Sequence, residues 1–252
     1  MQISWKSLIV SLYIWIFIGS TILPLFLLYL VIWILTWPFD PKKIITHYYT
    51  VLWSRLYLII NPGWRIHVEN REKIDISKPY ILVSNHQSII DIALLLQLRI
   101  NFKWVSKVEL ARLPFIGWVI WMNDHIVVRR GDKRSVIQMS EACKKALSEG
   151  ISVLMFPEGT RTRTGELQVF KEGAFILAKN SLVPILPVVL NGAGKALPRK
   201  GFWFGVNQVF TVRILDEIPA KIINRFDLQQ LIDYTKEIMS KELEELRYTK
   251  RG

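Results

Sequence analysis

The chain has 252 residues, 51% of them hydrophobic, and its mean hydropathy of +0.25 is too high for an ordinary soluble domain. Its formal net charge of +12 indicates a negatively charged partner: nucleic acid, anionic lipid or a phosphorylated substrate. The single cysteine, Cys143, excludes an internal disulfide and a cysteine metal cluster, and it favours a reducing compartment.

An uncharged apolar segment covers residues 7–39. As one helix it spans roughly 50 Å at 1.5 Å per residue, which exceeds a bilayer core of about 30 Å. Helix-breaking and small residues interrupt it between positions 19 and 24. It is therefore either one kinked or tilted spanning helix, or a hairpin of two shorter helices dipping into one leaflet. The hairpin is favoured, because it leaves Lys6, Lys42 and Lys43 on one side.

The rest of the chain alternates between strand-like and helix-like apolar runs. The strand-like runs are 64–69, 80–83, 103–106, 126–128, 151–156, 183–190 and 208–215, and the helix-like runs are 42–60, 89–98, 135–148, 172–180 and 227–246. Such alternation predicts an α/β fold, with a largely parallel central sheet flanked by helices. The apolar segment at 7–39 adds an N-terminal membrane-embedded helical segment to this fold. We expect one unit at residues 1–60 and a second at 61–252.

One stretch between a predicted strand and a predicted helix carries a histidine and an acid, His86 and Asp91. Ser88 fits the N-cap of the helix, with Asp91 as a capping-box acid three residues later. On one continuous helix, residues five apart point about 140° apart, so the two meet only if His86 lies before the helix and Asp91 reaches back. A histidine held by a carboxylate can act as a general base. Alternatively, Asp91 only caps the helix and His86 is a polar loop residue.

The stretch Phe-Pro-Glu-Gly-Thr-Arg at 156–161 follows another strand, where open α/β sheets bind ligands. Gly159 lets backbone amides approach an anion, Thr160 supplies a hydroxyl, and Arg161 supplies a planar fork suited to phosphate. Glu158 cannot bind phosphate directly, and we expect it to orient Arg161 or to accept a substrate hydroxyl. The alternative is a surface turn with a local glutamate–arginine pair.

Two further cations follow strand-like runs, Lys107 after 103–106 and Arg130 after 126–128. Together with Arg161 they would complete a phosphate pocket. Taken singly, each is an ordinary solvated surface charge.

Residues 198–204 combine two cations, Arg199 and Lys200, with three aromatic side chains. Cations suit anionic headgroups and aromatic rings suit the membrane interface. This composition predicts a second membrane contact, and the alternative is an ordinary turn before a strand.

Four blocks in this order carry a resemblance: His-x4-Asp at 86–91, an arginine block at 127–130, the complete Phe-Pro-Glu-Gly-Thr-Arg at 156–161, and a proline block at 183–188. The chain resembles the glycerolipid acyltransferase family over roughly residues 64 to 215, and within it the bacterial lysophosphatidic acid acyltransferases. Arg129 stands where the family commonly has an acid, so Arg130 is the preferred functional arginine.

The resemblance implies transfer of a fatty acyl group from acyl-CoA or acyl carrier protein to the sn-2 hydroxyl of lysophosphatidic acid, giving phosphatidic acid. His86 would deprotonate that hydroxyl while Asp91 orients His86. The residues that hold the phosphate or shape its site would be Lys107, Arg130, Glu158, Gly159, Thr160 and Arg161. No cofactor or metal is implied, and the four histidines lack paired ligand spacing.

The resemblance also sets expectations for location and partners. Residues 1–60 would anchor the chain, and residues 61–252 would be a catalytic domain on the cytoplasmic face of the inner membrane. Its partners would be membrane lipids, lysophosphatidic acid and the acyl thioester donor, with no nucleic acid. The alternatives are a different lysolipid acceptor or a non-enzymatic protein that binds anionic lipid. A hydrolase is disfavoured, because no serine stands in a Gly-x-Ser-x-Gly elbow.

Overall fold

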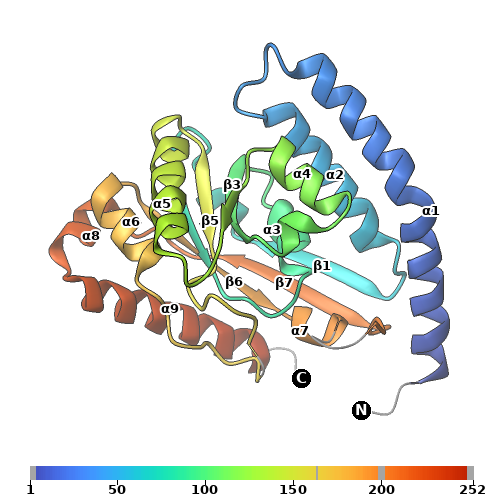
Figure 1. The fold of residues 1–252 in the computed structure, drawn as a ribbon. Coiled ribbons are helices and arrows are strands. Elements are labelled where there is room, and N and C mark those ends of the chain that lie inside the picture. Colours follow the sequence, from blue (N-terminus) through green and yellow to red (C-terminus); the bar gives the residue numbers. More distant parts are fainter. Residues whose placement is uncertain (1–3, 163, 198–201, 249–252) are drawn as a thin grey trace.

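A central sheet with helices on both faces forms the body of the protein in the computed structural model, which describes residues 4–162, 164–197 and 202–248 (Figure 1). The strands within these ranges are β1 (Trp64–Glu69), β2 (Ile81–Ser84), β3 (Phe102–Lys107), β4 (Ile126–Val128), β5 (Ser152–Met155), β6 (Ile185–Asn191) and β7 (Gln208–Ile214). Each predicted strand is present within three residues of its expected bounds.

The α-helices of the described residues alternate with these strands. They are α1 (Trp5–Thr36), α2 (Ile44–Ile59), α3 (Asp91–Leu96), α4 (Ile116–Met122), α5 (Lys133–Ser148), α6 (Gly173–Ser181), α7 (Ala193–Ala196), α8 (Ala220–Arg225) and α9 (Leu228–Tyr248). The sequence did not predict α4, α7 and α8, because helices of four to seven residues are too short to show a 3.6-residue period.

The strand order is β1-β7-β6-β2-β5-β3-β4. All neighbouring pairs are parallel except β6 and β7, which confirms the expected largely parallel sheet. Parallel strands end at the same edge, so the loops that follow β2, β5 and β3 lie beside one another.

Both faces of the sheet are covered, and this explains why the central strands read as unbroken apolar runs. Ile81, Val83 and Val153 pack toward α5, α6, α8 and α9. Leu82 and Leu154 point to the other face, toward α2, α3, α4 and α7. Side chains alternate across a strand, so each central strand contributes to both halves of the core.

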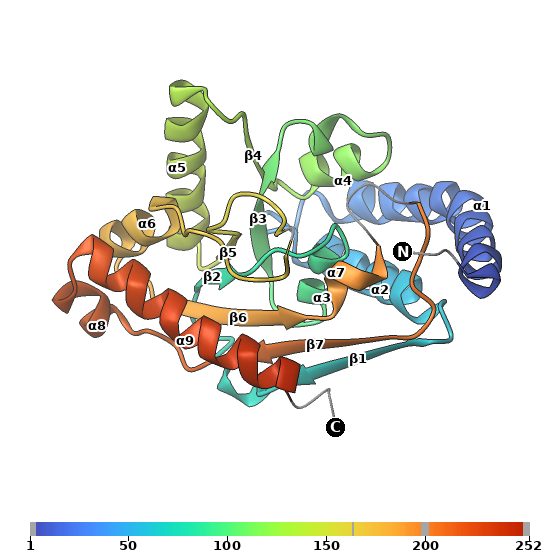
Figure 2. The ribbon, with the colours of Figure 1, turned by 90° about the horizontal axis from the view of Figure 1, so that it is seen from below.

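The N-terminal apolar segment forms one helix, so the expected hairpin was wrong. Helix α1 continues through residues 19–24 with Pro24 inside it, and Figure 2 shows that it bends along its length. A proline removes one hydrogen bond and kinks a helix without ending it when neighbouring elements support it. Support comes from α2, where the Tyr49 hydroxyl donates to the Leu25 carbonyl at 2.8 Å.

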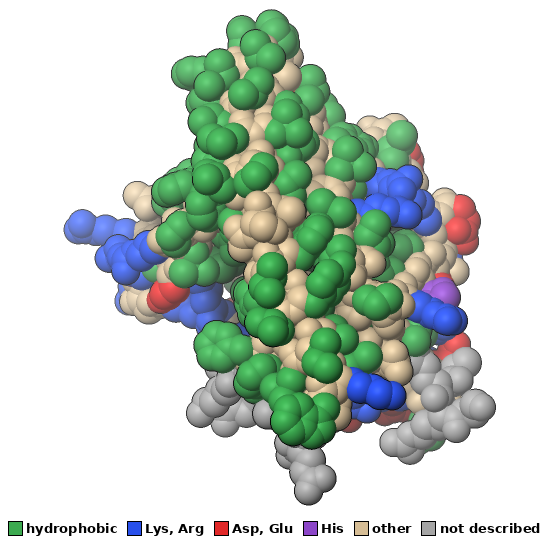
Figure 3. Space-filling view, turned by 90° about the vertical axis from the view of Figure 1, so that its right-hand side faces the viewer, with side chains coloured by type: hydrophobic (Ala, Val, Ile, Leu, Met, Phe, Trp, Pro, Cys, Tyr) green, Lys and Arg blue, Asp and Glu red, His purple; other side chains and the backbone are tan. Residues whose placement is uncertain are grey.

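Helix α1 packs against α2 along one side and exposes apolar side chains along the other. The ring centroids of Phe17 and Tyr57 lie 6.2 Å apart, and those of Tyr29 and Tyr49 lie 5.9 Å apart. The face that α1 presents is largely hydrophobic (Figure 3). Among the described residues, α1 is the one helix long and apolar enough to cross a membrane.

Two glycines at α7, Gly192 and Gly194, differ in the space that a side chain would have. Gly192 has a φ of +100°, and a Cβ there would lie 2.2 Å from the Val209 carbonyl oxygen. A Cβ on Gly194 would meet only the Gln87 Cβ, at 3.7 Å. We expect Gly192→Ala to lower the free energy of unfolding by about 1–3 kcal/mol. The matched control Gly194→Ala should change it by less than about 1 kcal/mol. Urea unfolding in detergent micelles measures both, and equal losses would contradict this account.

Candidate active site

The loop from β2 to α3 brings His86 and Asp91 together. Strand β2 ends at Ser84 and α3 begins at Asp91, so His86 lies off the helix. The Nδ1 of His86 lies 2.7 Å from the Asp91 Oδ2. The Asp91 side chain is fully buried, whereas that of His86 is 20% exposed. Among the described residues, none hydrogen-bonds the other ring nitrogen, Nε2. The pair thus has a buried carboxylate on one side and an accessible nitrogen on the other.

The carboxylate of Asp91 also shapes the turn. Its Oδ2 accepts hydrogen bonds from the backbone amides of Gln87 at 2.6 Å and Ser88 at 2.9 Å. The predicted Ser88 N-cap was wrong: Ile90 is the N-cap residue, and the Ser88 hydroxyl instead donates to the Leu197 carbonyl at 3.3 Å. Asp91 fixes the turn and the imidazole at once, because three donors converge on one oxygen.

The loop after β5 encloses His86 from two sides. The Phe156 ring stacks on the imidazole, with centroids 4.2 Å apart and planes at 20°. The backbone amide of His86 donates to the Glu158 Oε1 at 2.9 Å, and that of Thr162 donates to the His86 carbonyl at 2.8 Å. The two motifs, distant in sequence, therefore form one site.

Glu158 is 4% exposed, and its contacts connect two loops. Its Oε2 accepts from the backbone amide of Gln168 at 3.2 Å and from the side-chain amide at 3.1 Å. Burial raises the pKa of this carboxyl, while the hydrogen bonds from His86 and Gln168 oppose the shift. Among the described residues, no hydrogen bond or ion pair joins Glu158 to Arg161. Membership of the phosphate site therefore stays a prediction for Glu158.

Gly159, Thr160 and Arg161 continue this loop, and a lysine approaches them. Gly159 has a φ of +65°, and a Cβ there would lie 3.0 Å from both Cε and Nζ of Lys171. The Lys171 backbone amide donates to the Pro157 carbonyl at 2.9 Å, which keeps the lysine beside the loop. Sequence reasoning assigned Lys171 no role. The signal available was its place in the stretch 170–174, which also resembles the family.

Lys107 and Arg130 lie at unequal distances from this loop. Lys107 is the last residue of β3, which neighbours β5, and Arg130 follows β4, one strand further out. Adjacent strands are about 4.8 Å apart, so the backbone of Lys107 lies about 5 Å from the line of β5 and that of Arg130 about 10 Å from it. All the predicted cations lie at one edge of the sheet, with Arg130 outermost.

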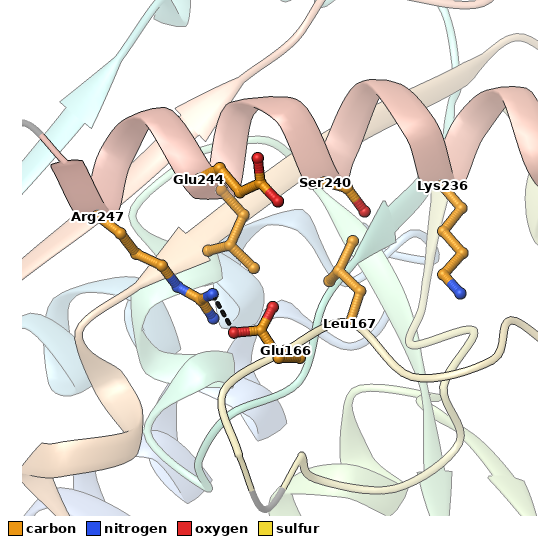
Figure 4. Close-up of a pocket in the computed structure, with 7 residues that line it drawn as sticks. Glu166, Leu167, Lys236, Ser240, Glu244 and Arg247 are labelled. Atoms are coloured by element: carbon orange, nitrogen blue, oxygen red, sulfur yellow. Dashed lines mark hydrogen bonds and ion pairs between the residues drawn. The ribbon is translucent and has the colours of Figure 1, made fainter.

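The loop beyond Arg161 is fastened to the C-terminal helix. The Thr162 hydroxyl donates to the Glu166 carbonyl at 2.8 Å, and the Arg247 guanidinium from α9 donates to the Glu166 carboxylate and the Gly165 carbonyl. A cavity of about 230 Å³ lies between this loop and α9 (Figure 4). None of its lining residues is a predicted site residue, and the contact of α9 with this loop is made by Arg247 at Gly165 and Glu166.

The other histidines are separate from this site. His47 and His125 are buried, and His67 lies on the edge strand β1. In the part of the chain that the structure describes, no group of three or more His, Cys, Asp or Glu side chains is arranged to hold a metal ion.

Comparisons with known proteins agree on one family. The acyltransferase family profile matches residues 65–191. A chloroplastic 1-acyl-sn-glycerol-3-phosphate acyltransferase of Arabidopsis thaliana is 39% identical over 162 residues, which is 64% of this chain and 45% of that protein. A Chlamydomonas reinhardtii 1-acyl-sn-glycerol-3-phosphate acyltransferase is 34% identical, over 75% of this chain and 56% of its own length. The chain thus spans about half the length of these two relatives.

A human relative is covered more fully, and one crystal structure has the same fold. The human 1-acyl-sn-glycerol-3-phosphate acyltransferase alpha is 32% identical over 75% of this chain and 68% of its own. The crystal structure of the 1-acyl-sn-glycerophosphate acyltransferase PlsC from Thermotoga maritima covers 96% of both chains, with a TM-score of 0.78 and 23% identity. At that identity the likeness shows the fold.

The raised pKa of Glu158 predicts a pH-dependent stability. Because its folded pKa lies above the ordinary value of 4.5, the folded state binds the proton more tightly than the unfolded state. Stability from this group is present below 4.5 and is lost as pH rises through the folded pKa. We expect wild type to exceed Glu158→Gln in stability most at about pH 4 and least near neutral pH. Urea midpoints across this range measure the difference, and a gap that widens with pH would overturn the assignment.

Proposed function

We propose, because the chain belongs to the acyltransferase family, that it transfers a fatty acyl group from an acyl thioester to the sn-2 hydroxyl of lysophosphatidic acid, giving phosphatidic acid. The observation that carries the proposal is the 2.7 Å contact between His86 Nδ1 and Asp91 Oδ2, beside the loop that bears Arg161. The names of the relatives support the acceptor. Another lysolipid acceptor would use the same base, so an acceptor panel tests the choice.

In this mechanism His86 is the general base. Its Nδ1–H is donated to Asp91, which leaves a lone pair on Nε2 for the proton of the acceptor hydroxyl. As the hydroxyl oxygen bonds to the thioester carbonyl carbon, the C–S bond breaks and the imidazolium returns the proton to the leaving sulfur. The buried Asp91 carboxylate stabilises the imidazolium between these steps. General-base catalysis of this kind contributes typically 10²- to 10⁴-fold.

Positioning of the acceptor supplies the other part of the rate. We assign the phosphate to Arg161, Lys107 and Arg130, with Gly159 and Thr160 offering backbone and hydroxyl groups. A phosphate held at this edge of the sheet keeps the glycerol hydroxyl within reach of His86, and such orientation lowers the entropic cost of reaction.

The acyl donor is a thioester, and either acyl-CoA or acyl carrier protein provides one. Both present the same carbonyl to His86, and neither requires a bound cofactor for the step above. Parallel assays with the two donors, with the product identified by mass, decide between them.

Both substrates are amphiphiles, so we assign residues 1–60 to membrane anchoring and 61–252 to catalysis, at the cytoplasmic face of the inner membrane. The exposed apolar face of α1 supports the anchor. The predicted contact at 198–204 lies partly outside the described residues, which include 202–204. Phe202 is 73% exposed, and its carbonyl accepts from the Trp15 Nε1 at 2.8 Å, so this end of the stretch lies against α1.

Replacing the proposed base tests enzyme against binding protein. We expect His86→Ala to abolish transfer, because the variant loses the ring nitrogen Nε2 that takes the proton of the acceptor hydroxyl. Folding and vesicle binding should persist, since the imidazole is partly exposed. Radiolabelled acyl transfer and vesicle co-flotation measure the two properties. Activity within about tenfold of wild type would falsify the base assignment.

Replacing Asp91 by asparagine separates the charge of its side chain from its size. Asp91→Asn keeps the size of the side chain but removes the charge that stabilises the imidazolium, so kcat should fall by about 10²- to 10⁴-fold. The apparent KM should change little, because no substrate contact is assigned to Asp91. Steady-state kinetics with thermal melting as the folding control measures this, and an unchanged kcat would remove Asp91 from the mechanism.

A further inference from the structure

The segment Leu110–Met122, which connects β3 to β4 and is called the insertion below, lies against α1. It consists of a 3₁₀ turn at Leu110–Arg112, a tight turn, and α4. The rings of Phe115 and Trp118 pack on Phe26 of α1, with centroids 5.5 and 5.2 Å from it. The Trp33 Nε1, also on α1, donates to the Met122 carbonyl at 3.0 Å. The insertion is therefore joined to α1 at both ends of α4.

The insertion exposes large apolar side chains beside the apolar face of α1. Trp118 is 48% exposed and Trp121 is 58% exposed, and Leu113 and Ile116 are exposed by 44% and 42%. Such clusters on a surface mark an interaction site. Tryptophan is enriched at membrane–water interfaces. The Trp121 Nε1 donates to the Ala111 carbonyl at 3.2 Å, so this indole is held in a fixed orientation.

The backbone of the insertion is strained and closely built. Phe115 has φ +62° and ψ −60°, and the Ile116 amide donates to the Pro114 carbonyl at 2.7 Å. This is a γ-turn of the rare, strained form, which persists only where its surroundings hold it. A Cβ on Gly117 would lie 2.3 Å from the Ala111 carbonyl oxygen, so the turn and α4 are in close contact. The insertion therefore has one defined conformation, held by the contact between its turn and α4.

Its place in the chain ties it to the site. The insertion begins three residues after Lys107, at the end of β3. After α4 the chain returns through β4 to Arg130. The depth at which α4 lies in a lipid surface would therefore set the height of these two cations relative to the headgroups. Arg112, on the insertion itself, adds an exposed positive charge suited to anionic lipid.

We propose that Leu110–Met122 is a further membrane-contact element, which enters the interfacial region of an anionic bilayer beside α1 and holds Lys107 and Arg130 at the level of the lipid headgroups. The proposal rests on the proposed membrane contact of α1 and is independent of the acyl-transfer chemistry. A bilayer is the occupant that matches, because the exposed apolar surface continues from α1 onto α4 and includes two interfacial tryptophans with a neighbouring arginine.

The depth of this element in the bilayer is the direct test. The single cysteine, Cys143, is buried, so a Cys143→Ala chain allows one label at a time. An environment-sensitive fluorophore is attached at Trp121→Cys, and at Ile76→Cys as the matched control. Ile76 is 85% exposed and precedes β2, at the edge of the sheet opposite His86.

The full chain is reconstituted in mixed vesicles of phosphatidylethanolamine and phosphatidylglycerol. We expect nitroxide-labelled lipids to quench the label at position 121 and to leave that at 76 unquenched. Equal, solvent-like signals at the two positions would overturn the proposal. So would a label at 121 that is shielded from both lipid and aqueous quenchers, because that result assigns the surface to a second copy of the chain.

Kinetics give an independent readout. The double variant Trp118→Gln with Trp121→Gln should raise the apparent KM for vesicle-borne lysophosphatidic acid about tenfold, which corresponds to about 1.4 kcal/mol. Its kcat, and its activity on acceptor in detergent micelles, should match Ile76→Gln. Equal losses in vesicles and micelles would assign these tryptophans to folding and would overturn the proposal. If wild type transfers no acyl group, the proposed function fails while the depth measurement still decides this one.

Discussion

The carboxylate of Asp91 is the interaction on which the site depends. It is fully buried, and a buried charge is costly unless donors compensate it. Three donors converge on Oδ2: the His86 ring and the amides of Gln87 and Ser88. The same oxygen therefore holds the turn after β2 and sets the orientation of the imidazole.

The sheet topology then brings the other groups to this turn. Strand β2 lies between β5 and β6, and the loop after β5 contacts the His86 turn through Phe156, Glu158 and Thr162. Lys107 ends the next strand outward. Because these strands are parallel, groups about 75 residues apart in sequence share one edge. Glu158 acts mainly as a connector here, since its Oε1 accepts from the turn after β2 and its Oε2 accepts from Gln168, further along its own loop.

The strands and the His86–Asp91 pairing were predictable because both rest on local patterns. Strands buried on both faces read as apolar runs, and the separation of five residues left one geometry in which the pair meets. The continuity of α1 was not predictable, because packing on α2 offsets the local cost of Pro24. The approach of Lys171 to Gly159 and the contacts of Glu158 with His86 and Gln168 join residues 10 to 72 positions apart, and no local pattern in the sequence indicates them. Helix α4 is too short to show a period.

The pairing of β1 with β7 has a consequence for the order in which the protein acquires its structure. Strand β1 is an edge strand whose one neighbour, β7, begins 144 positions after it. Synthesis proceeds from the N-terminus, so α1 emerges from the ribosome long before β1 has a partner. The sheet is thus completed late in translation, after α1 and α2 have been made, and contacts of such long range form slowly.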